Sequence, residues 1–259
     1  MKIIHDVREW KDFCAELRKS GSIGFVPTMG ALHEGHLSLV RRARLENDYC
    51  VASIFVNPAQ FNDKTDLEKY PRMPERDSAL FEAEGVTAIF MPDAQAMYPD
   101  GYRYKVSEAE LSARYCGAKR PGHFDGVLSV VLKLLLLTGA DRAYFGEKDY
   151  QQYMLIRGMA EAFFLDTLVV PCALIRETDG LAMSSRNLRL GAEARKKAPL
   201  FSKALAAASV AEASRMLEAE GFTVEYIEEL RDETRKETRR LAAVWLDGVR
   251  LIDNIRTDS

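Results

Sequence analysis

The chain has 259 residues, of which 47% are hydrophobic, so it can bury a large core and has a length between that of one and two ordinary domains. Its 36 basic and 39 acidic residues give a formal net charge of -3. This balance excludes the strongly basic character typical of proteins that bind nucleic acids or anionic membranes, so a bound anion must be held by a local site.

The N-terminal ten residues carry charges every few positions and lack the apolar stretch of a secretory signal, which predicts a cytoplasmic protein. The four cysteines form no close pair for zinc or dithiol chemistry, so we expect reduced thiols that fill the core. The most apolar run, residues 127–137, is interrupted by Lys133 and has about half of the roughly 20 residues that a membrane-spanning helix needs. We therefore expect a buried helix there and no membrane partner.

The first part of the chain alternates short β-type runs with helical patterns. Strands are predicted at residues 23–27, 50–57 and 87–91, and helical patterns at residues 37–46 and 74–84 separate them. Strands joined by crossover helices of this length form a parallel sheet that is covered on both faces. The pattern therefore predicts a Rossmann-like α/β domain.

We expect the parallel sheet to continue with strands at residues 142–145 and 166–174, after the apolar helix. Beyond Asn187 the sequence changes character. Residues 190–217 are rich in Ala, Lys and Glu at helical spacing, and residues 223–230 and 243–246 look like short strands.

The predicted fold is thus an α/β protein in which a Rossmann-like parallel-sheet domain, residues 1–177, is followed by a smaller α+β domain, residues 178–259. No internal repeat or low-complexity linker is visible, so we expect a short junction. A cleft at such a junction is the natural place for a ligand.

The strongest chemical signal is the run Pro-Thr-Met-Gly-Ala-Leu-His-Glu-Gly-His at residues 27–36, which follows the first predicted strand and opens a helix. Ligands of open α/β sheets bind beyond the carboxyl ends of the strands, where helix N-termini present free N–H groups to phosphates. Gly30 lets the backbone approach a nucleotide, and Gly35 leaves space between His33 and His36. Two imidazoles at this spacing can donate hydrogen bonds to phosphate oxygens; the alternative is a pair of surface or capping histidines.

Two further polar segments follow predicted strands or precede helices. Asn57 and Gln60 flank a turn, where their amides could face a ligand cleft at the strand ends, or could simply cap the turn. Arg120 and His123 flank a Pro-Gly turn before the apolar helix. This pair could close over an anion, or the segment could serve only to start the helix.

The run Phe-Gly-Glu-Lys-Asp-Tyr-Gln-Gln at residues 145–152 offers Lys148 as a charge for a triphosphate, and Asp149 as an acceptor for ribose hydroxyls or a Mg²⁺-bound water. On its own it could be a solvated turn. At residues 184–186, two serines and an arginine in a loop can bind the β- and γ-phosphates of a nucleotide, or can form a linker with a helix cap.

Residues 33–36 resemble the HxGH signature of the nucleotidyltransferase superfamily, and residues 27–36 as a whole are similar to the form found in pantothenate synthetases. The resemblance covers nearly all of residues 1–190 and includes segments 120–124, 145–152 and 176–187; residues 250–254 are also similar to the family's ending. Residues 225–240 depart from the family pattern and look shortened. Because the resemblance implies that the C-terminal domain acts as a lid, this departure bears on closure rather than on the reaction.

The resemblance implies an ATP-dependent ligase that condenses pantoate with β-alanine through a pantoyl adenylate, releasing AMP and pyrophosphate. It also implies a homodimer and Mg²⁺ as the partner of ATP, with no dedicated protein ligands for the metal. The catalytic residues would be His36, His33, Lys148 and Arg186. The residues expected to bind ATP are Met29, Gly30, His33, His36, Gly146, Glu147, Lys148, Asp149, Ile175, Met183, Ser184, Ser185 and Arg186. The residues expected to bind pantoate are Gln60, Gln152, Asn57, Arg120 and His123.

Two alternatives belong to other classes. A different nucleotidyltransferase, such as one that adenylylates a phosphorylated cofactor precursor or a truncated aminoacyl-tRNA synthetase, would share the histidine pair but not Gln60 and Gln152. A tRNA ligase would also need a basic surface and a longer chain. A catalytically silent nucleotide-binding protein would have a damaged site, whereas His33, His36, Lys148 and Arg186 are all present.

Overall fold

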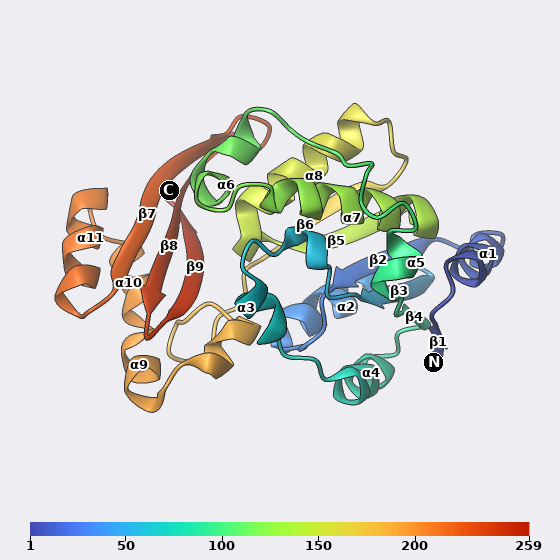
Figure 1. The fold of residues 1–259 in the computed structure, drawn as a ribbon, viewed down its shortest axis with the longest axis horizontal. Helices are drawn as coiled ribbons and strands as arrows, with labels where there is room; N and C mark the ends of the chain where they lie inside the picture. Colours follow the sequence, from blue (N-terminus) through green and yellow to red (C-terminus); the bar gives the residue numbers. More distant parts are fainter. Residues whose placement is uncertain (259) are drawn as a thin grey trace. The chain divides into compact units, whose positions relative to one another are not determined.

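The computed structural model describes residues 1–258, except for the side chain of Lys64. The chain forms two compact units (Figure 1). The first comprises Met1–Glu147 and Gln151–Cys172, and the second comprises Lys148–Tyr150 together with the chain from Ala173 onward. The second unit therefore takes a short segment from within the sequence of the first. The domain boundary predicted at residue 177 stays a prediction.

A six-stranded sheet in the order β1-β4-β3-β2-β5-β6 forms the centre of the first unit. Every neighbouring pair of strands is parallel, which confirms the predicted Rossmann-like sheet. The strands are β1 (Lys2–Ile4), β2 (Ile23–Thr28), β3 (Tyr49–Ile54), β4 (Ala88–Phe90), β5 (Arg142–Gly146) and β6 (Leu168–Cys172).

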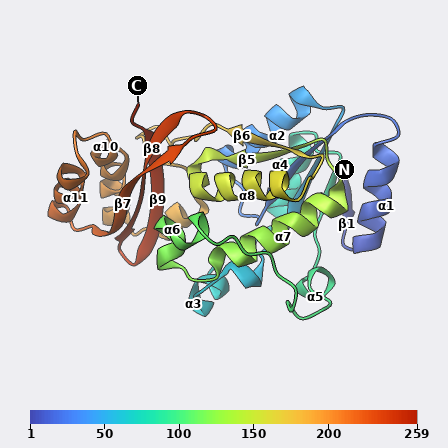
Figure 2. The ribbon, with the colours of Figure 1, turned by 90° about the horizontal axis from the view of Figure 1, so that it is seen from above.

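Helices cover both faces of this sheet: α7 and α8 lie on one face, and α2 and α4 lie on the other (Figure 2). Strands buried from both sides read as continuous apolar runs, as β2 and β3 do. The helices are α1 (Val7–Leu17), α2 (Glu34–Glu46), α3 (Lys64–Glu68), α4 (Pro74–Ala83), α5 (Ala94–Met97), α6 (Tyr115–Lys119), α7 (His123–Thr138) and α8 (Tyr150–Ala162), with short 3-10 helices η1 (Pro58–Gln60), η2 (Leu111–Ala113) and η3 (Glu147–Asp149).

The strand order reverses between β2 and β5. These two neighbours pair in parallel through Gly24 with Arg142 and Phe25 with Ala143, and the chain continues from them toward opposite edges of the sheet. The carboxyl ends of strands at such a reversal are the usual ligand-binding position of open α/β sheets. The two segments that follow β2 and β5 are the two that the sequence marked most strongly.

The predicted buried helix is α7, which extends the expected range in both directions. Its ends are set by Gly122 and Gly139, both in the left-handed region with φ of 77° and 54°. Lys133, the charge within the apolar run, donates to the carbonyl of Met97 at 2.7 Å and lies 4.4 Å from the centre of the Tyr98 ring. Within residues 1–258, no helix combines the length and apolarity needed to cross a membrane.

The second unit contains an antiparallel sheet in the order β7-β8-β9, with α10 and α11 packed on one face (Figures 1 and 2). This confirms the predicted small α+β C-terminal part. Its elements are η4 (Ser185–Arg189), α9 (Ala192–Lys197), α10 (Leu200–Leu205), α11 (Val210–Ala219), β7 (Thr223–Asp232), β8 (Glu237–Leu246) and β9 (Val249–Arg256).

Three features of the second unit differ from the prediction. The helical stretch expected at residues 190–217 is three short helices, because Pro199 and Ser209 cap new helix starts. Strand β8 begins well before the expected residue 243, since it carries buried charged residues that break the apolar pattern. Strand β9 was not predicted; it follows a tight turn at Asp247 and Gly248, which both have positive φ.

All four cysteines are buried and free, as expected from their spacing. Burial raises the pKa of Cys172 to about 11, and the nearby Arg42 only partly opposes this. Such a thiol stays protonated and unreactive at neutral pH.

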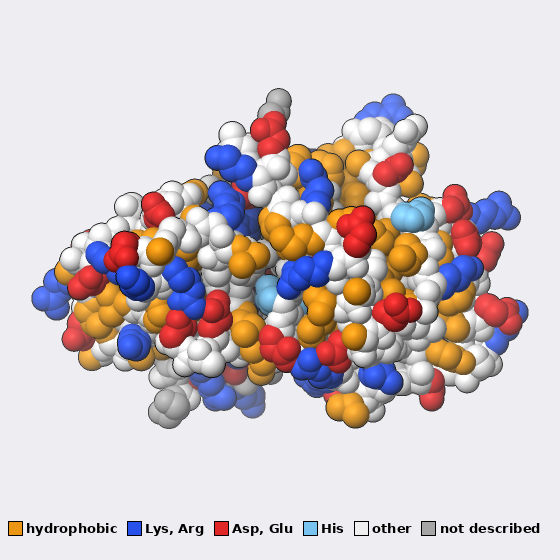
Figure 3. All heavy atoms as spheres, turned by 90° about the horizontal axis from the view of Figure 1, so that it is seen from below, with side chains coloured by type: hydrophobic (Ala, Val, Ile, Leu, Met, Phe, Trp, Pro, Cys, Tyr) orange, Lys and Arg blue, Asp and Glu red, His pale blue; other side chains and the backbone are white. Residues whose placement is uncertain are grey.

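The surface charges of the two signs are mixed. On the face drawn in Figure 3, Lys and Arg side chains alternate with Asp and Glu, with hydrophobic side chains between them. This distribution agrees with the small net charge of the whole chain.

The buried indole of Trp10 gives a test of the first unit's core. Its Nε1 donates to the Thr138 hydroxyl at 3.1 Å, and both residues are inaccessible to solvent. We expect Thr138→Val, which keeps the shape but removes the acceptor, to lower the free energy of unfolding by about 1–3 kcal/mol in urea denaturation. Thr138→Ser keeps the hydroxyl and should lose less; equal losses for the two variants would contradict this account.

Candidate active site

The two predicted histidines lie at the start of α2. His33 is the residue that caps the helix: its Nδ1 accepts the Gly35 N–H at 3.2 Å, and the Nδ1 of His36 accepts the His33 N–H at 3.3 Å. The ring centres are 4.1 Å apart. The capping alternative is therefore correct for the Nδ1 atoms, and it has a chemical consequence: each neutral ring must carry its proton on Nε2.

The loop before α2 is held by a residue that the sequence analysis missed. Asp77, on α4, is inaccessible to solvent, and its two carboxylate oxygens accept the N–H groups of Ala31 at 2.7 Å and Leu32 at 2.9 Å. Gly30 has a φ of 82°, and a Cβ there would lie 2.9 Å from Asp77 Oδ2. The glycine thus allows the loop to close onto the carboxylate. No sequence signal marks Asp77, because it lies within an ordinary charged helix.

A cavity of about 350 Å³ lies beside this loop, in the first unit. Its size suits a small ligand. Two of the predicted ATP-binding residues, Met29 and Gly30, line it. The remaining lining residues are Ile54, Phe55, Val56, Pro58, Leu67, Arg72, Met73, Pro74, Asp77, Pro92, Asp93 and Ala94.

The predicted amide pair lies around η1. Asn57 is buried, and its side chain uses all four hydrogen-bonding positions inside the protein: Nδ2 donates to Gln60 Oε1 and the Gly126 carbonyl, while Oδ1 accepts from the Ala59 N–H and the Tyr98 hydroxyl. Gln60 is 9% exposed, and its Nε2 lies 3.0 Å from the Met29 sulfur. Asn57 thus fixes which end of the Gln60 amide is the oxygen.

Arg120 and His123 support the same segment from the start of α7. His123 Nδ1 donates to the Gln60 carbonyl at 2.7 Å, and Arg120 Nη2 donates to it at 3.3 Å. Arg120 Nη1 also lies 3.0 Å from His123 Nε2, which must accept because Nδ1 carries the proton. One turn later, a Cβ at Gly126 would lie only 2.3 Å from the Ala59 carbonyl oxygen, so only glycine allows this approach.

The adjacent glutamines of α8 differ in their surroundings. Gln151 is buried and holds the segment before α6: its Nε2 donates to the carbonyls of Leu111 and Arg114, and its Oε1 accepts the Cys116 N–H. Gln152, the predicted substrate residue, is half-buried. The prediction therefore fell on the glutamine that is more exposed to solvent.

In the segment after β5, Gly146 and Glu147 belong to the first unit and Lys148 belongs to the second. A Cβ at Gly146 would have no neighbour within 4 Å. In the second unit, the Lys148 ammonium lies 3.4 Å from Asp149 Oδ2, and its side chain is 18% exposed. The Lys148 carbonyl accepts the Asn254 side-chain amide at 3.1 Å.

The predicted phosphate loop of the second unit is a closed turn. The Met183 N–H donates to the Ile175 carbonyl at 3.0 Å, and the Ser184 hydroxyl accepts the Arg186 N–H at 3.2 Å, so Ser184 caps η4, which begins at Ser185. These contacts bring together five of the predicted ATP-binding residues. The loop therefore has a defined backbone conformation.

Arg176, next to Ile175, anchors this turn to β9. Its guanidinium donates to both carboxylate oxygens of Asp253 at 2.7 and 3.0 Å, and the Asp253 side chain is inaccessible to solvent. Burial raises the pKa of Asp253, against the lowering effect of the Arg176 hydrogen bonds and charge.

No group of three or more His, Cys, Asp and Glu side chains that could hold a metal ion occurs in the part of the chain that the structure describes.

Comparison with known proteins identifies relatives along the whole chain. The model of the pantoate–β-alanine ligase family matches residues 2–256. A pantothenate synthetase of Bdellovibrio bacteriovorus is 54% identical over 96% of this chain and 98% of its own. A crystal structure of the Thermus thermophilus pantothenate synthetase has a TM-score of 0.89 and 44% identity, covering 98% of this chain and 99% of that one.

A further solved structure is similar to this chain with a ligand bound. It is the pantoate–β-alanine ligase of Francisella tularensis, complexed with Beta-gamma ATP and β-alanine, with a TM-score of 0.93 and 37% identity. The similarity covers 100% of this chain and 98% of that one.

The role of Asp77 can be tested by stability. Asp77→Asn replaces one acceptor with a donor that faces a backbone N–H, so we expect a loss of about 1–3 kcal/mol in the free energy of unfolding, measured with urea. Asp6→Asn is the matched control, since Asp6 caps α1 in an exposed position and Asn caps equally well. A similar loss in both variants would contradict a special role for Asp77.

The Arg176–Asp253 pair predicts a pH-dependent effect. Arg176→Met leaves the buried carboxylate of Asp253 without its guanidinium partner and should cost about 3 kcal/mol at pH 8. Without the guanidinium, the pKa of Asp253 in the folded variant lies still further above its value in the unfolded chain. The free energy of unfolding of the variant is therefore higher at low pH, where Asp253 is neutral, and falls as the pH rises through the folded-state pKa. The deficit measured in urea should therefore shrink at pH 5.

The double variant Arg176→Met, Asp253→Asn removes the titrating group and serves as the control. Its deficit should not change between pH 5 and pH 8. If the single variant showed the same lack of pH dependence, the explanation would be wrong.

Proposed function

Because the chain belongs to the pantoate–β-alanine ligase family, we propose that it uses ATP to join pantoate to β-alanine, giving pantothenate, AMP and pyrophosphate. The observation that carries this proposal is the pair His33 and His36, whose Nδ1 atoms are both occupied by backbone N–H groups at the start of α2. Both rings are thereby set to donate from Nε2.

In the proposed first step, a carboxylate oxygen of pantoate attacks the α-phosphorus of ATP. The bond from the α-phosphorus to the bridging oxygen breaks, and pyrophosphate leaves with that oxygen. The product is pantoyl adenylate, a mixed anhydride. In the second step the β-alanine amine attacks its acyl carbon, AMP leaves, and the amine loses a proton.

Positioning and charge stabilisation would supply most of the catalysis, since the protein takes part in no covalent step. We assign His36, helped by His33, to the α-phosphate, where negative charge increases in the transition state. The N-terminal end of α2 adds its backbone dipole to the same effect.

We assign pantoate to Gln60 and Gln152. The fixed amide orientation of Gln60 supports this, because a side chain that is already oriented loses little entropy on binding. Asn57, Arg120 and His123 were predicted to contact pantoate directly. Their hydrogen bonds to the side chain and backbone of Gln60 support an indirect role in pantoate binding, in which they hold Gln60 in place.

We assign the β- and γ-phosphates to Lys148, Ser184, Ser185 and Arg186, and the ribose to Asp149. We also assign ATP to Met29, Gly30, Gly146 and Glu147; the open space beside Gly146 supports an approach of the nucleotide there. The backbone of Ile175 and Met183 would face the adenine. We propose that Mg²⁺ arrives with ATP, held by phosphate oxygens and water. We also propose that the protein acts as a cytoplasmic homodimer, as the family resemblance implies.

The reaction can be tested by mass spectrometry of purified protein incubated with ATP, Mg²⁺ and pantoate, with and without β-alanine. We expect pantothenate and AMP only when both substrates are present, and pantoate-dependent release of pyrophosphate. His36→Ala should lower the rate by about 10²–10³, the usual loss for one donor to a transition-state charge. No product and no pantoate-dependent pyrophosphate would refute the proposal.

A further inference from the structure

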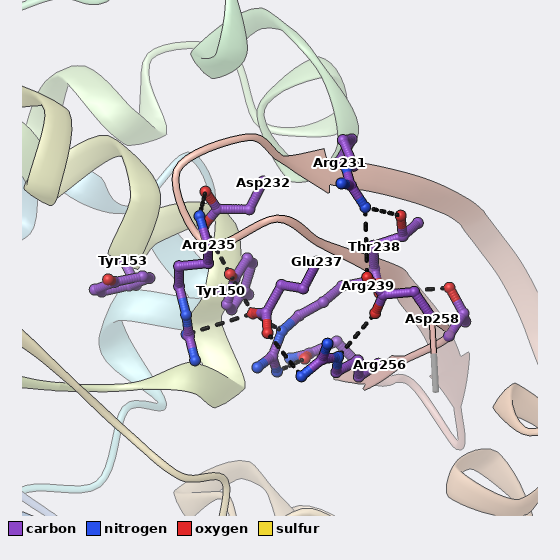
Figure 4. Close-up of polar contacts among 12 residues, drawn as sticks. Tyr150, Tyr153, Arg231, Asp232, Arg235, Glu237, Thr238, Arg239, Arg256 and Asp258 are labelled. Carbon is purple, nitrogen blue, oxygen red and sulfur yellow. Dashed lines mark hydrogen bonds and ion pairs between the residues drawn. The ribbon is translucent and has the colours of Figure 1, made fainter.

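The hydroxyl of Tyr150 lies between two buried carboxylates of the β7–β8 hairpin (Figure 4). Tyr150 is 1% exposed, and its oxygen is 2.7 Å from Asp232 Oδ2 and 2.7 Å from Glu237 Oε1. Asp232 closes the hairpin as well, since its Oδ1 accepts the N–H groups of Thr234 and Arg235. The ends of β7 and β8 thus hold the side chain of a residue that follows Lys148 by two positions.

Guanidinium groups balance the charge of this cluster. Arg239 Nε donates to Glu237 Oε1 at 2.9 Å, and the Arg239 guanidinium lies 4.2 Å from the centre of the Tyr150 ring. Arg235 and Arg256 approach Glu237 at 3.4 and 3.7 Å. Burial and the two carboxylates raise the pKa of Tyr150, so the group remains a phenol that donates a proton.

The carboxylate of Glu237 is held in its ionised form. Burial acts to raise its pKa, but the hydrogen bonds from Tyr150 and Arg239 and the charges of Arg239 and Arg235 outweigh this effect and lower the pKa. Tyr150 therefore donates to an anion, which makes a stronger hydrogen bond than a neutral acceptor would.

Arg239 connects this cluster to a second anchor. Its Nη1 donates to Asn254 Oδ1 at 2.9 Å, and the Asn254 Nδ2 donates to the Lys148 carbonyl at 3.1 Å. The Lys148 segment is therefore fixed at two points, one through its own backbone and one through Tyr150. The Arg239 guanidinium takes part in both, because it donates to Asn254 and to Glu237, the acceptor of Tyr150.

We propose that Tyr150, Asp232, Glu237, Arg239 and Asn254 are positioning residues that hold the Lys148 ammonium where it stabilises the phosphates of ATP. The inference rests on the proposed function, in which Lys148 contacts those phosphates. It also gives a role to residues 225–240, the segment that was expected from the sequence to depart from the family pattern.

The physical reason is the small size of the element that carries Lys148. The 3-10 helix η3 has three residues, and a lysine has a long flexible side chain, so the element alone fixes the ammonium poorly. A displacement of about 1 Å in a catalytic group can cost about 10²-fold in rate. Buried charged clusters add little stability over a well-packed apolar core, so holding one geometry is the better account of this cluster.

The test is a double-mutant cycle between Tyr150→Phe and Lys148→Ala, measured as pantoate-dependent exchange of labelled pyrophosphate into ATP. We expect Tyr150→Phe to slow exchange about tenfold in the natural background, with the KM for pantoate unchanged. In the Lys148→Ala background the same substitution should change exchange less than about twofold, because the group that it positions is gone.

Tyr144→Phe is the matched control. Tyr144 is also inaccessible to solvent, and its hydroxyl donates to a carboxylate, that of Glu46 at 2.9 Å, which is not part of the cluster around Tyr150. Exchange should stay within about twofold in this variant. Glu237→Gln is a second, milder variant that keeps an acceptor for Tyr150, and it should show a smaller loss with the same dependence on Lys148.

Equal losses from Tyr150→Phe in both backgrounds, or full exchange in Tyr150→Phe or Lys148→Ala, would overturn the positioning role while leaving pantothenate formation intact. If Tyr150→Phe did not fold, the cycle with Glu237→Gln would decide in the same way. Absence of pantoate-dependent exchange in the unsubstituted protein would instead overturn the proposed function, and the positioning role with it.

Discussion

The carboxylate of Asp77 is closed off from water, and each of its oxygens accepts a backbone N–H from the loop between β2 and α2. A buried carboxylate is tolerated only while such hydrogen bonds are kept. The loop therefore cannot change its conformation without leaving the carboxylate buried and without donors, or exposing it to water. In this loop Gly30 has a positive φ. The loop leads to His33, which has the extended conformation of a helix cap. The protonation of both histidine rings at Nε2 follows from that cap.

Polar groups elsewhere in the molecule serve orientation in the same way. Around Gln60, the amide of Asn57 donates to the Gln60 side chain, and the imidazole of His123 donates to the Gln60 backbone carbonyl. In the second unit, Arg239 performs a comparable task for Tyr150 and Asn254. Each group is costly to bury and is hydrogen-bonded within the protein, which is the condition under which a polar network selects one conformation.

The sequence predicted the parallel sheet well, because β2 and β3 are continuous apolar runs bounded by turns and helices. It also marked His33, His36 and the amide pair, because these polar side chains come directly after predicted strands. It did not reveal Asp77 or Tyr150, because the importance of each comes from partners distant in sequence: Asp77 lies 45 or more residues from the N–H groups that it accepts, and Tyr150 lies more than 80 from its carboxylates. Strand β8 was shortened in the prediction for a related reason, since its buried arginines read as solvent-exposed until their acceptors are known.

The carbonyl of Lys148 receives its hydrogen bond from a residue 106 positions further along the chain. During synthesis on the ribosome, domains generally fold as units from the N-terminal side. The six-stranded sheet can therefore form while β9 is still being made, but the Lys148 segment gains its backbone anchor only when Asn254 has emerged. The nascent chain thus acquires a folded sheet before it acquires a fixed lysine.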